Sequence, residues 1–205
     1  AGDRRPCLLP TVADVLGPAL SELPRNIKVE IGGHQERSFL ETYLIVLSPG
    51  VPEIPELAAA RAAGVAITGE LELSSRYIDS TMIAITGTNG KSTTTTLAGA
   101  IARASGRPTF VGGNLGEPLA LAVGTPAGSA GGTCVVEVSS FQLETTESFS
   151  PRVAVLLNIT PDHLDRYHDL EHYAATKGRI FAAQHASDFA VVNLDDPLAL
   201  RQTEG

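Results

Sequence analysis

Ile-Ala-Ile-Thr-Gly-Thr-Asn-Gly-Lys-Ser-Thr, residues 83–93, is the segment of the chain that gives the strongest indication of its fold. The apolar run Met82–Thr86 predicts a buried strand, and Ser92–Ser105 predicts a helix that starts directly after the glycines. Glycines between a strand and a helix let backbone amides approach phosphate oxygens, and the first turn of the helix adds its positive end. The stretch therefore predicts a phosphate-binding loop.

The loop also predicts a nucleotide and a metal ion. We expect Lys91 to reach the β- and γ-phosphates, and the hydroxyl group of Ser92 or Thr93 to bind Mg²⁺. The other predicted cofactor-binding residues form the loop itself: Gly87, Thr88, Asn89 and Gly90. The spacing departs from the usual Walker A pattern, because Ile85 stands six residues before the lysine, where that pattern has glycine. The alternative is a glycine turn that only caps a helix.

Outward from this loop, short apolar runs alternate with alanine-rich segments. Further strands are predicted at Thr42–Leu47, Val65–Thr68, Thr133–Val138, Val153–Ile159 and Phe189–Val192, and further helices at Pro55–Ala63 and Glu171–Gln184. Because the strands are apolar on both faces and alternate with helices, they predict an α/β fold with a parallel sheet covered on both sides. Ligands bind such sheets at the carboxyl ends of the strands. Ala1–Pro24 and Gly124–Gly132 are predicted connectors.

Two candidate site residues follow predicted strands. Glu137 interrupts an apolar strand near its carboxyl end, where burying a carboxylate is costly unless it pairs with a charge or a metal. The alternative for Glu137 is a strand end that faces solvent. His163 lies just beyond the strand predicted at Val153–Ile159, at the same ligand-binding edge. The alternative for His163 is an ordinary surface histidine.

Lys177 is the third candidate, because it interrupts an apolar helix face. On the helix predicted at Glu171–Gln184 it shares this face with Tyr173, Ile180, Phe181 and Gln184. One interpretation is that its amine extends along the protein to solvent. The functional interpretations are an amine held near phosphates or a metal, or an amine with a depressed pKa that becomes chemically modified.

Composition excludes several classes of protein. The 205 residues are 43% hydrophobic and 19% charged, which is typical of a globular protein and not of a disordered one. No apolar run reaches the roughly 18–20 residues of a membrane span, and we find no signal peptide. A net charge of −8 argues against nucleic acid as a partner. Cys7 and Cys134 are too few for a disulfide framework, so we expect a cytoplasmic protein.

Four motifs in the chain resemble the Mur ligase family, in the order found there. They are GTNGKST (87–93), EVSSFQLET (137–145), NITPDHLDRY (158–167) and ATKGRIF (175–181), and the resemblance covers roughly Asn26 to Pro197. SSFQLE and DHLDRY are most similar to the members of the family that add D-glutamate. The resemblance implies an ATP-dependent amide ligase of peptidoglycan synthesis. It would add D-glutamate to UDP-N-acetylmuramoyl-L-alanine through an acyl phosphate.

The resemblance also implies roles for individual residues. Lys91 would hold the phosphates of ATP, Glu137 with Ser92 or Thr93 would bind a first Mg²⁺, and His163 would bind a second. Lys177 matches the family's carbamylated lysine, beside the second metal. The positions that match contacts to the UDP-muramoyl substrate are Ser48, Asn114, Gln142 and His163.

The resemblance predicts how the chain is organised. We expect residues 1–78 to be part of a Rossmann-like, UDP-substrate-binding domain and residues 79–205 to be a truncated P-loop-type ATPase core. We expect the family's C-terminal domain to be absent, so that the chain is an incomplete ligase that is inactive alone. We also expect a monomer. The alternatives are another Mur-type ligase, a folylpolyglutamate-type ligase, or a non-catalytic nucleotide-binding fragment.

Overall fold

The computed structural model describes residues 29–30 and 33–204. Ala1–Pro24, a predicted connector, lies outside the described residues, as do Cys7 and the start of the family resemblance at Asn26. The described residues divide into two compact units. The smaller unit comprises the residues up to Tyr43 together with Glu53–Ala66, and the larger comprises Leu44–Pro52 and the residues from Ile67 onward.

The described part of the smaller unit contains two helices, α2 (Glu36–Leu40) and α3 (Pro55–Ala62). As predicted, α3 has proline in its first turn, where the missing N–H costs nothing, and it ends just before Gly64, whose φ is 80°. The short helix α2 was not predicted, because none of its five residues is buried and it shows no apolar face.

Strands β1 (Leu44–Leu47) and β2 (Ala66–Gly69) form a two-stranded sheet. The prediction of a buried strand at Thr42–Leu47 was wrong in two respects. The strand begins at Leu44, and its residues alternate between exposed and half-buried positions, so one of its faces stays open among the described residues. Helix α4 (Glu70–Ser75) follows β2 directly and was not predicted.

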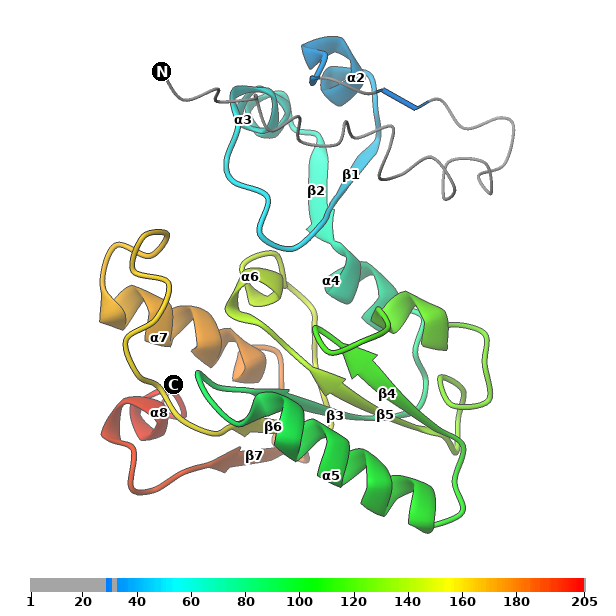
Figure 1. Cartoon of the computed structure of the whole chain (residues 1–205). Helices are drawn as coiled ribbons and strands as arrows, with labels where there is room; N and C mark the ends of the chain where they lie inside the picture. The colour runs from blue at the N-terminus through cyan, green and yellow to red at the C-terminus, as the bar shows by residue number, and fades with distance from the viewer. Residues whose placement is uncertain (1–28, 31–32, 205) are drawn as a thin grey trace, which may run out of the picture. The chain divides into compact units, whose positions relative to one another are not determined.

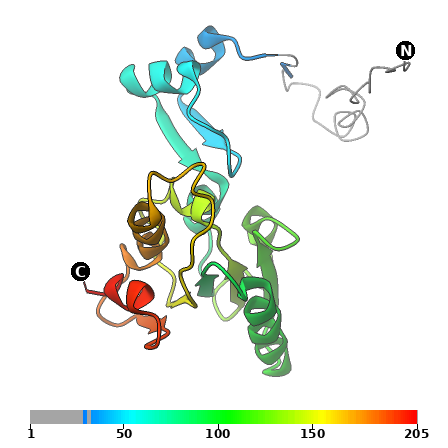
Figure 2. The ribbon, with the colours of Figure 1, turned by 60° about the vertical axis from the view of Figure 1, so that its left-hand side comes forward.

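The larger unit is built on a five-stranded parallel sheet with the order β4-β5-β3-β6-β7, as the sequence predicted for this class of fold (Figure 1). Its strands are β3 (Thr81–Thr86), β4 (Thr109–Gly113), β5 (Thr133–Glu137), β6 (Val153–Leu156) and β7 (Phe189–Val192). Helix α5 (Lys91–Ala104) connects β3 to β4, and α7 (Leu170–Gly178) connects β6 to β7. Figures 1 and 2 show α5 and α7 on opposite sides of this sheet.

The core of the larger unit lies on the sheet face away from α5. Ala84, Val136 and Ala154 of the central strands pack there against residues of α4, of α6 (Ser140–Leu143) and of two short 3₁₀ turns. These turns are η1 (Leu119–Ala122) and η2 (Arg179–Phe181). A second cluster joins Leu156 of β6 to residues of α7 and α8 (Pro197–Arg201). The two clusters bury apolar surface, the main favourable term in folding.

The helix predicted at Glu171–Gln184 is shorter than expected. It ends at Gly178, and the chain tightens into η2. In this conformation the Nε atom of Arg179 donates a hydrogen bond of 2.8 Å to the carbonyl oxygen of Leu143. A tertiary contact therefore accompanies the end of the helix. Within residues 29–30 and 33–204, no helix has the length and apolar character needed to cross a membrane.

Candidate active site

The predicted phosphate loop runs from the end of β3 into α5, and it needs glycine at two places. Gly90 precedes the first residue of α5 with φ 82°, a left-handed conformation that costs other residues about 1–2 kcal/mol. Gly87 has φ 150°, and a Cβ atom there would lie 3.0 Å from the Cβ atom of Leu157. The N–H groups of the first turn of α5 have no carbonyl partner within the helix, which suits an anion.

The loop is held in place by the segment that follows β6. This contact was not predicted from the sequence. The carbonyl oxygen of Asn158 accepts from the N–H of Thr88 at 2.9 Å, and its side-chain oxygen accepts from the N–H of Asn89 at 2.8 Å. The N–H of Thr160 donates to the hydroxyl oxygen of Thr88 at 3.0 Å. A signal was available, because Asn158 and Thr160 lie just after the strand that pairs with β3.

Two lysines reach carbonyl oxygens of the same loop. The Nζ atom of Lys91 donates to the carbonyl oxygen of Thr88 at 3.0 Å. The Nζ atom of Lys177 donates to the carbonyl oxygen of Gly87 at 2.9 Å and lies 4.7 Å from the centre of the Tyr173 ring. Lys177 is 1% exposed, so the interpretation that it extends to solvent is wrong.

The environment of Lys177 changes its protonation. Burial, together with the positive charge of Lys91, lowers the pKa of this amine to about 7, although Asp162 acts in the opposite direction. A buried ammonium is costly because the surroundings do not solvate its charge. The neutral amine is therefore well populated near neutral pH, which is the form that reacts with electrophiles.

Glu137 is the last residue of β5 and is 2% exposed, so the solvent-facing alternative is wrong. Its Oε1 atom accepts a hydrogen bond of 2.7 Å from the Nδ2 atom of Asn114. Its Oε2 atom is buried and has no hydrogen-bond partner among the described residues. A buried, unpartnered carboxylate oxygen is costly unless a cation binds it, so the residue fits a metal ion.

Among the described residues, no cluster of three or more His, Cys, Asp and Glu side chains is placed to hold a metal ion. A Mg²⁺ site does not need such a cluster, because proteins bind Mg²⁺ through one or two carboxylates, water and substrate phosphates. His163 is 44% exposed at its side chain, lies 4.9 Å from the Phe141 ring and is 3.6 Å from Asp162. Like Ser92 and Thr93, His163 is an exposed residue.

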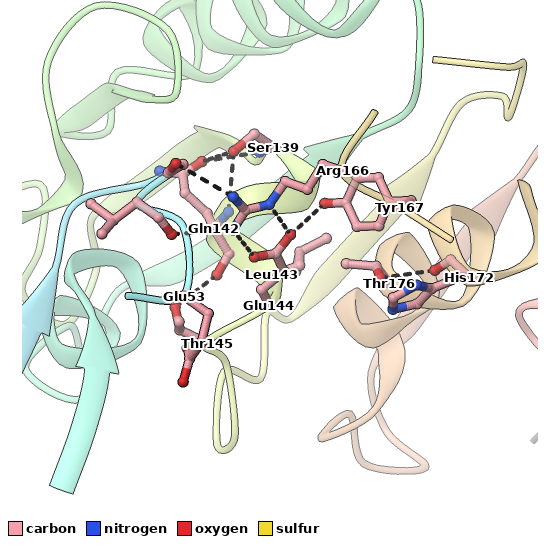
Figure 3. Close-up of polar contacts among 12 residues, drawn as sticks. Glu53, Ser139, Gln142, Leu143, Glu144, Thr145, Arg166, Tyr167, His172 and Thr176 are labelled. Carbon is pink, nitrogen blue, oxygen red and sulfur yellow. Dashed lines mark hydrogen bonds and ion pairs between the residues drawn. The ribbon is translucent and has the colours of Figure 1, made fainter. Parts of the chain in front are cut away.

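A cavity of about 350 Å³ brings three of the predicted substrate-binding residues together. Ser48, Asn114 and Gln142 line it, and His163 is not among its lining residues. Gln142 also caps α6, because its Oε1 atom accepts from the N–H of Ser139 at 3.0 Å, as Figure 3 shows. This reciprocal cap is a further role that the Ser-x-x-Gln spacing indicates.

Two known domain families match the sequence. Residues 85–204 match the Mur ligase middle domain, and residues 9–69 match the Mur ligase MurD-like, N-terminal domain. The chain is 53% identical over 189 residues to the UDP-N-acetylmuramoylalanine–D-glutamate ligase of Anaeromyxobacter dehalogenans, and 55% identical over 188 residues to that of Geobacter sp. (strain M21). These alignments cover 90% and 91% of the chain but about 40% of each relative's length.

Two solved structures have a similar fold. One is the UDP-N-acetylmuramate:L-alanyl-gamma-D-glutamyl-meso-diaminopimelate ligase from Neisseria meningitides, with a TM-score of 0.55 and 16% identity over 80% of this chain and 56% of that one. The other is the MurF ligase of Thermotoga maritima in complex with ADP. It has a TM-score of 0.50 and 20% identity over 83% of this chain and 47% of that one. At these identities the likeness shows the fold alone.

Proposed function

The chain belongs to the Mur ligase family, and from this membership we propose that it is part of an ATP-dependent ligase that joins D-glutamate to UDP-N-acetylmuramoyl-L-alanine. The observation that carries the proposal is the convergence of Lys91 and Lys177 on the phosphate loop. The names of relatives at 53% and 55% identity support D-glutamate as the added amino acid over the other Mur-type and folylpolyglutamate-type alternatives.

The proposed reaction has two steps. The L-alanine carboxylate attacks the γ-phosphorus of ATP, and ADP leaves, which gives an acyl phosphate. The amine of D-glutamate then attacks the acyl carbon, and phosphate leaves as the amide bond forms and the amine loses a proton. Phosphoryl transfer depends mainly on positioning and on neutralising charge. A loop that suits anions, beside the amine of Lys91, fits the needs of the first step.

In this proposal the phosphates of ATP lie against the loop Gly87–Gly90, with Lys91 and the first N–H groups of α5 binding their oxygens. Glu137 and the hydroxyl group of Ser92 or Thr93 would hold Mg²⁺. When bound, Mg²⁺ neutralises negative charge on the phosphate oxygens. The unpartnered Oε2 atom of Glu137 supports this assignment.

We propose that Lys177 acts as a carbamate, formed when its neutral amine takes up CO₂ and releases a proton. Its burial and its lowered pKa support this. The carbamate and His163 would together hold a second Mg²⁺. The sugar nucleotide is assigned to Ser48, Asn114 and Gln142, whose shared cavity supports the assignment. His163 would contact the same substrate from outside this cavity.

We further propose a domain boundary near residues 78 and 79, with the substrate-binding domain before it and the ATP-binding domain after it. The two matched families support this boundary, because they cover residues 9–69 and 85–204 and leave it between them. We expect the protein to act as a monomer in the cytoplasm, on small-molecule substrates.

The proposal is tested by binding and turnover. Titration calorimetry of this chain with MgATP tests the phosphate loop, and the absence of binding would contradict the assignment. Phosphate release is then measured with MgATP, UDP-N-acetylmuramoyl-L-alanine and D-glutamate, against a control without D-glutamate. Release that requires D-glutamate supports the ligase. Incorporation of a different amino acid would point to another Mur-type ligase, and binding of MgATP without turnover would point to a nucleotide-binding fragment.

A further inference from the structure

Arg166 lies in the segment between β6 and α7, and its guanidinium group is fixed by an acidic partner. Its Nε and Nη2 atoms donate to the two carboxylate oxygens of Glu144, at 2.9 and 2.6 Å. The hydroxyl group of Tyr167 donates to the same carboxylate at 2.7 Å, as Figure 3 shows. Two parallel hydrogen bonds to one carboxylate set the plane of a guanidinium as well as its position.

The same guanidinium group also reaches the turn after β1. Its Nη1 atom donates to the carbonyl oxygen of Gly50 at 3.4 Å, and its Nη2 atom donates to that of Val51 at 3.3 Å. The Cζ atom of the Arg166 guanidinium group lies 5.0 Å from the centre of the Phe141 ring. Gly50 faces that ring as well, because a Cβ atom built there would lie 3.7 Å from Phe141. Arg166 and Phe141 together form the surface on which the turn rests.

The turn carries Ser48, which lines the cavity of about 350 Å³ with Asn114 and Gln142. The turn closes on itself weakly, through a hydrogen bond of 3.4 Å from the N–H of Val51 to the carbonyl oxygen of Ser48. Its position relative to Gln142 therefore depends on outside contacts. Arg166 supplies them, because its partner Glu144 lies directly after α6, the helix that carries Gln142.

We propose that Arg166 is a positioning residue, which ties the Ser48 turn to α6 and so holds the two sides of the sugar-nucleotide cavity in place. The proposal rests on the assignment of this cavity to the UDP-linked substrate. Arg166 acts through the backbone of Gly50 and Val51 and touches no reacting atom. The phosphate loop is held separately, by Asn158 and Thr160, so Arg166 serves the sugar nucleotide and not ATP.

The first test needs no ligand. Hydrogen–deuterium exchange is measured on peptides that contain residues 48–52, in the full chain and in Arg166→Met. We expect faster exchange of this turn in the variant. Arg152→Met is the matched control, because Arg152 also pairs with a carboxylate, Asp188, at 2.8 Å and lies 5.2 Å from the Phe189 ring, at the start of β7. Unchanged exchange of the turn in Arg166→Met would overturn the proposal.

The second test measures affinity. In Arg166→Met, binding must fix the freed turn again, and fixing one backbone residue costs about 1–2 kcal/mol. UDP-N-acetylmuramoyl-L-alanine should therefore bind this variant about tenfold more weakly, with ATP affinity unchanged. The affinity of Arg166→Lys for the sugar nucleotide should lie between those of wild type and Arg166→Met, because lysine keeps the positive charge but cannot form two parallel hydrogen bonds with Glu144. Arg166→Lys replaces Arg166→Met if the latter does not fold. Equal affinity of wild type and Arg166→Met for the sugar nucleotide overturns the positioning role. If the wild-type chain does not bind the sugar nucleotide, the proposed substrate is wrong, and the exchange experiment still decides whether Arg166 holds the turn.

Discussion

The amine of Lys177 donates a 2.9 Å hydrogen bond to the carbonyl oxygen of Gly87, a residue 90 positions earlier in the chain. This bond joins α7 to the first glycine of the phosphate loop, although α5 and α7 lie on opposite sides of the sheet. Both helices can reach the loop because β3 and β6 are neighbours in the sheet. The contact therefore follows from strand order.

Carbamylation of Lys177 should depend on pH in a definite direction. CO₂ reacts with the neutral amine, and the pKa of Lys177 is lowered to about 7, so the carbamate should be present at pH 8 and decline as pH falls through 7 toward 6. Carbon-13 NMR with labelled CO₂ measures the amount of carbamate at each pH. Lys177→Met should lack the signal, and Lys91→Met should keep it. A signal that persists in Lys177→Met would refute the assignment.

Replacing Gly87 by alanine should weaken nucleotide binding. The new Cβ atom would lie 3.0 Å from Leu157, and the backbone angle of 150° is unfavourable for alanine. Strain of about 1–3 kcal/mol corresponds to a loss of MgATP affinity of roughly ten- to a hundredfold, measured by calorimetry. Gly106→Ala is the control, because Gly106 has φ 80° with nothing within 4 Å and lies beyond the far end of α5. Equal losses in both variants would point to a general loss of stability.

Glu137→Gln should separate the charge of this residue from its structural role. The amide oxygen can still accept the hydrogen bond from Asn114, so we expect the melting temperature to stay within a few degrees of wild type. We expect the gain in ATP affinity on adding Mg²⁺ to be lost, because the negative oxygen for the cation is gone. Calorimetry in Mg²⁺ and in EDTA tests this. An unchanged effect of Mg²⁺ would remove Glu137 from the metal site.

Acid stability should depend on Glu72, which is 1% exposed. Burial raises its pKa, but hydrogen bonds from Ser148, Glu147 and Arg76 outweigh burial and hold the pKa below its ordinary value of 4.5. Because the folded-state pKa is depressed, the stabilisation is fully present above pH 4.5 and is lost as pH falls through the lower, folded-state value.

Urea unfolding of wild type and Glu72→Gln between pH 7 and pH 3 measures this contribution. At pH 7, Glu72→Gln should lower the free energy of unfolding by about 1.5–3 kcal/mol, the contribution of a hydrogen bond to a charged group. The two proteins should converge as pH falls. Glu171→Gln, which breaks the exposed ion pair with Arg201, should change stability by less than about 1 kcal/mol. A constant difference at all pH values would argue against the depressed pKa.

Most strands were predictable because their apolar residues repeat locally, and β7 was predicted at its observed bounds. β4 was missed because its five residues end in two glycines, which argue locally for a turn. Glycine is needed in β4 because of its neighbours. A Cβ atom at Gly113 would lie 2.3 Å from the carbonyl oxygen of Glu137, on the adjacent strand.

Local sequence was enough to predict the glycine loop between β3 and α5, the parallel α/β class and the family, because glycine spacing, apolar periodicity and motif order are local properties of the chain. It also indicated Glu137 and Lys177, since a charged residue inside an apolar pattern stands out. The partners of these residues became visible only in the folded chain. Strand order brings Gly87 to Lys177, and the register of β4 against β5 brings Asn114 to Glu137. Burial and hydrogen-bond partners depend on segments far apart in the chain, and local pattern does not specify them.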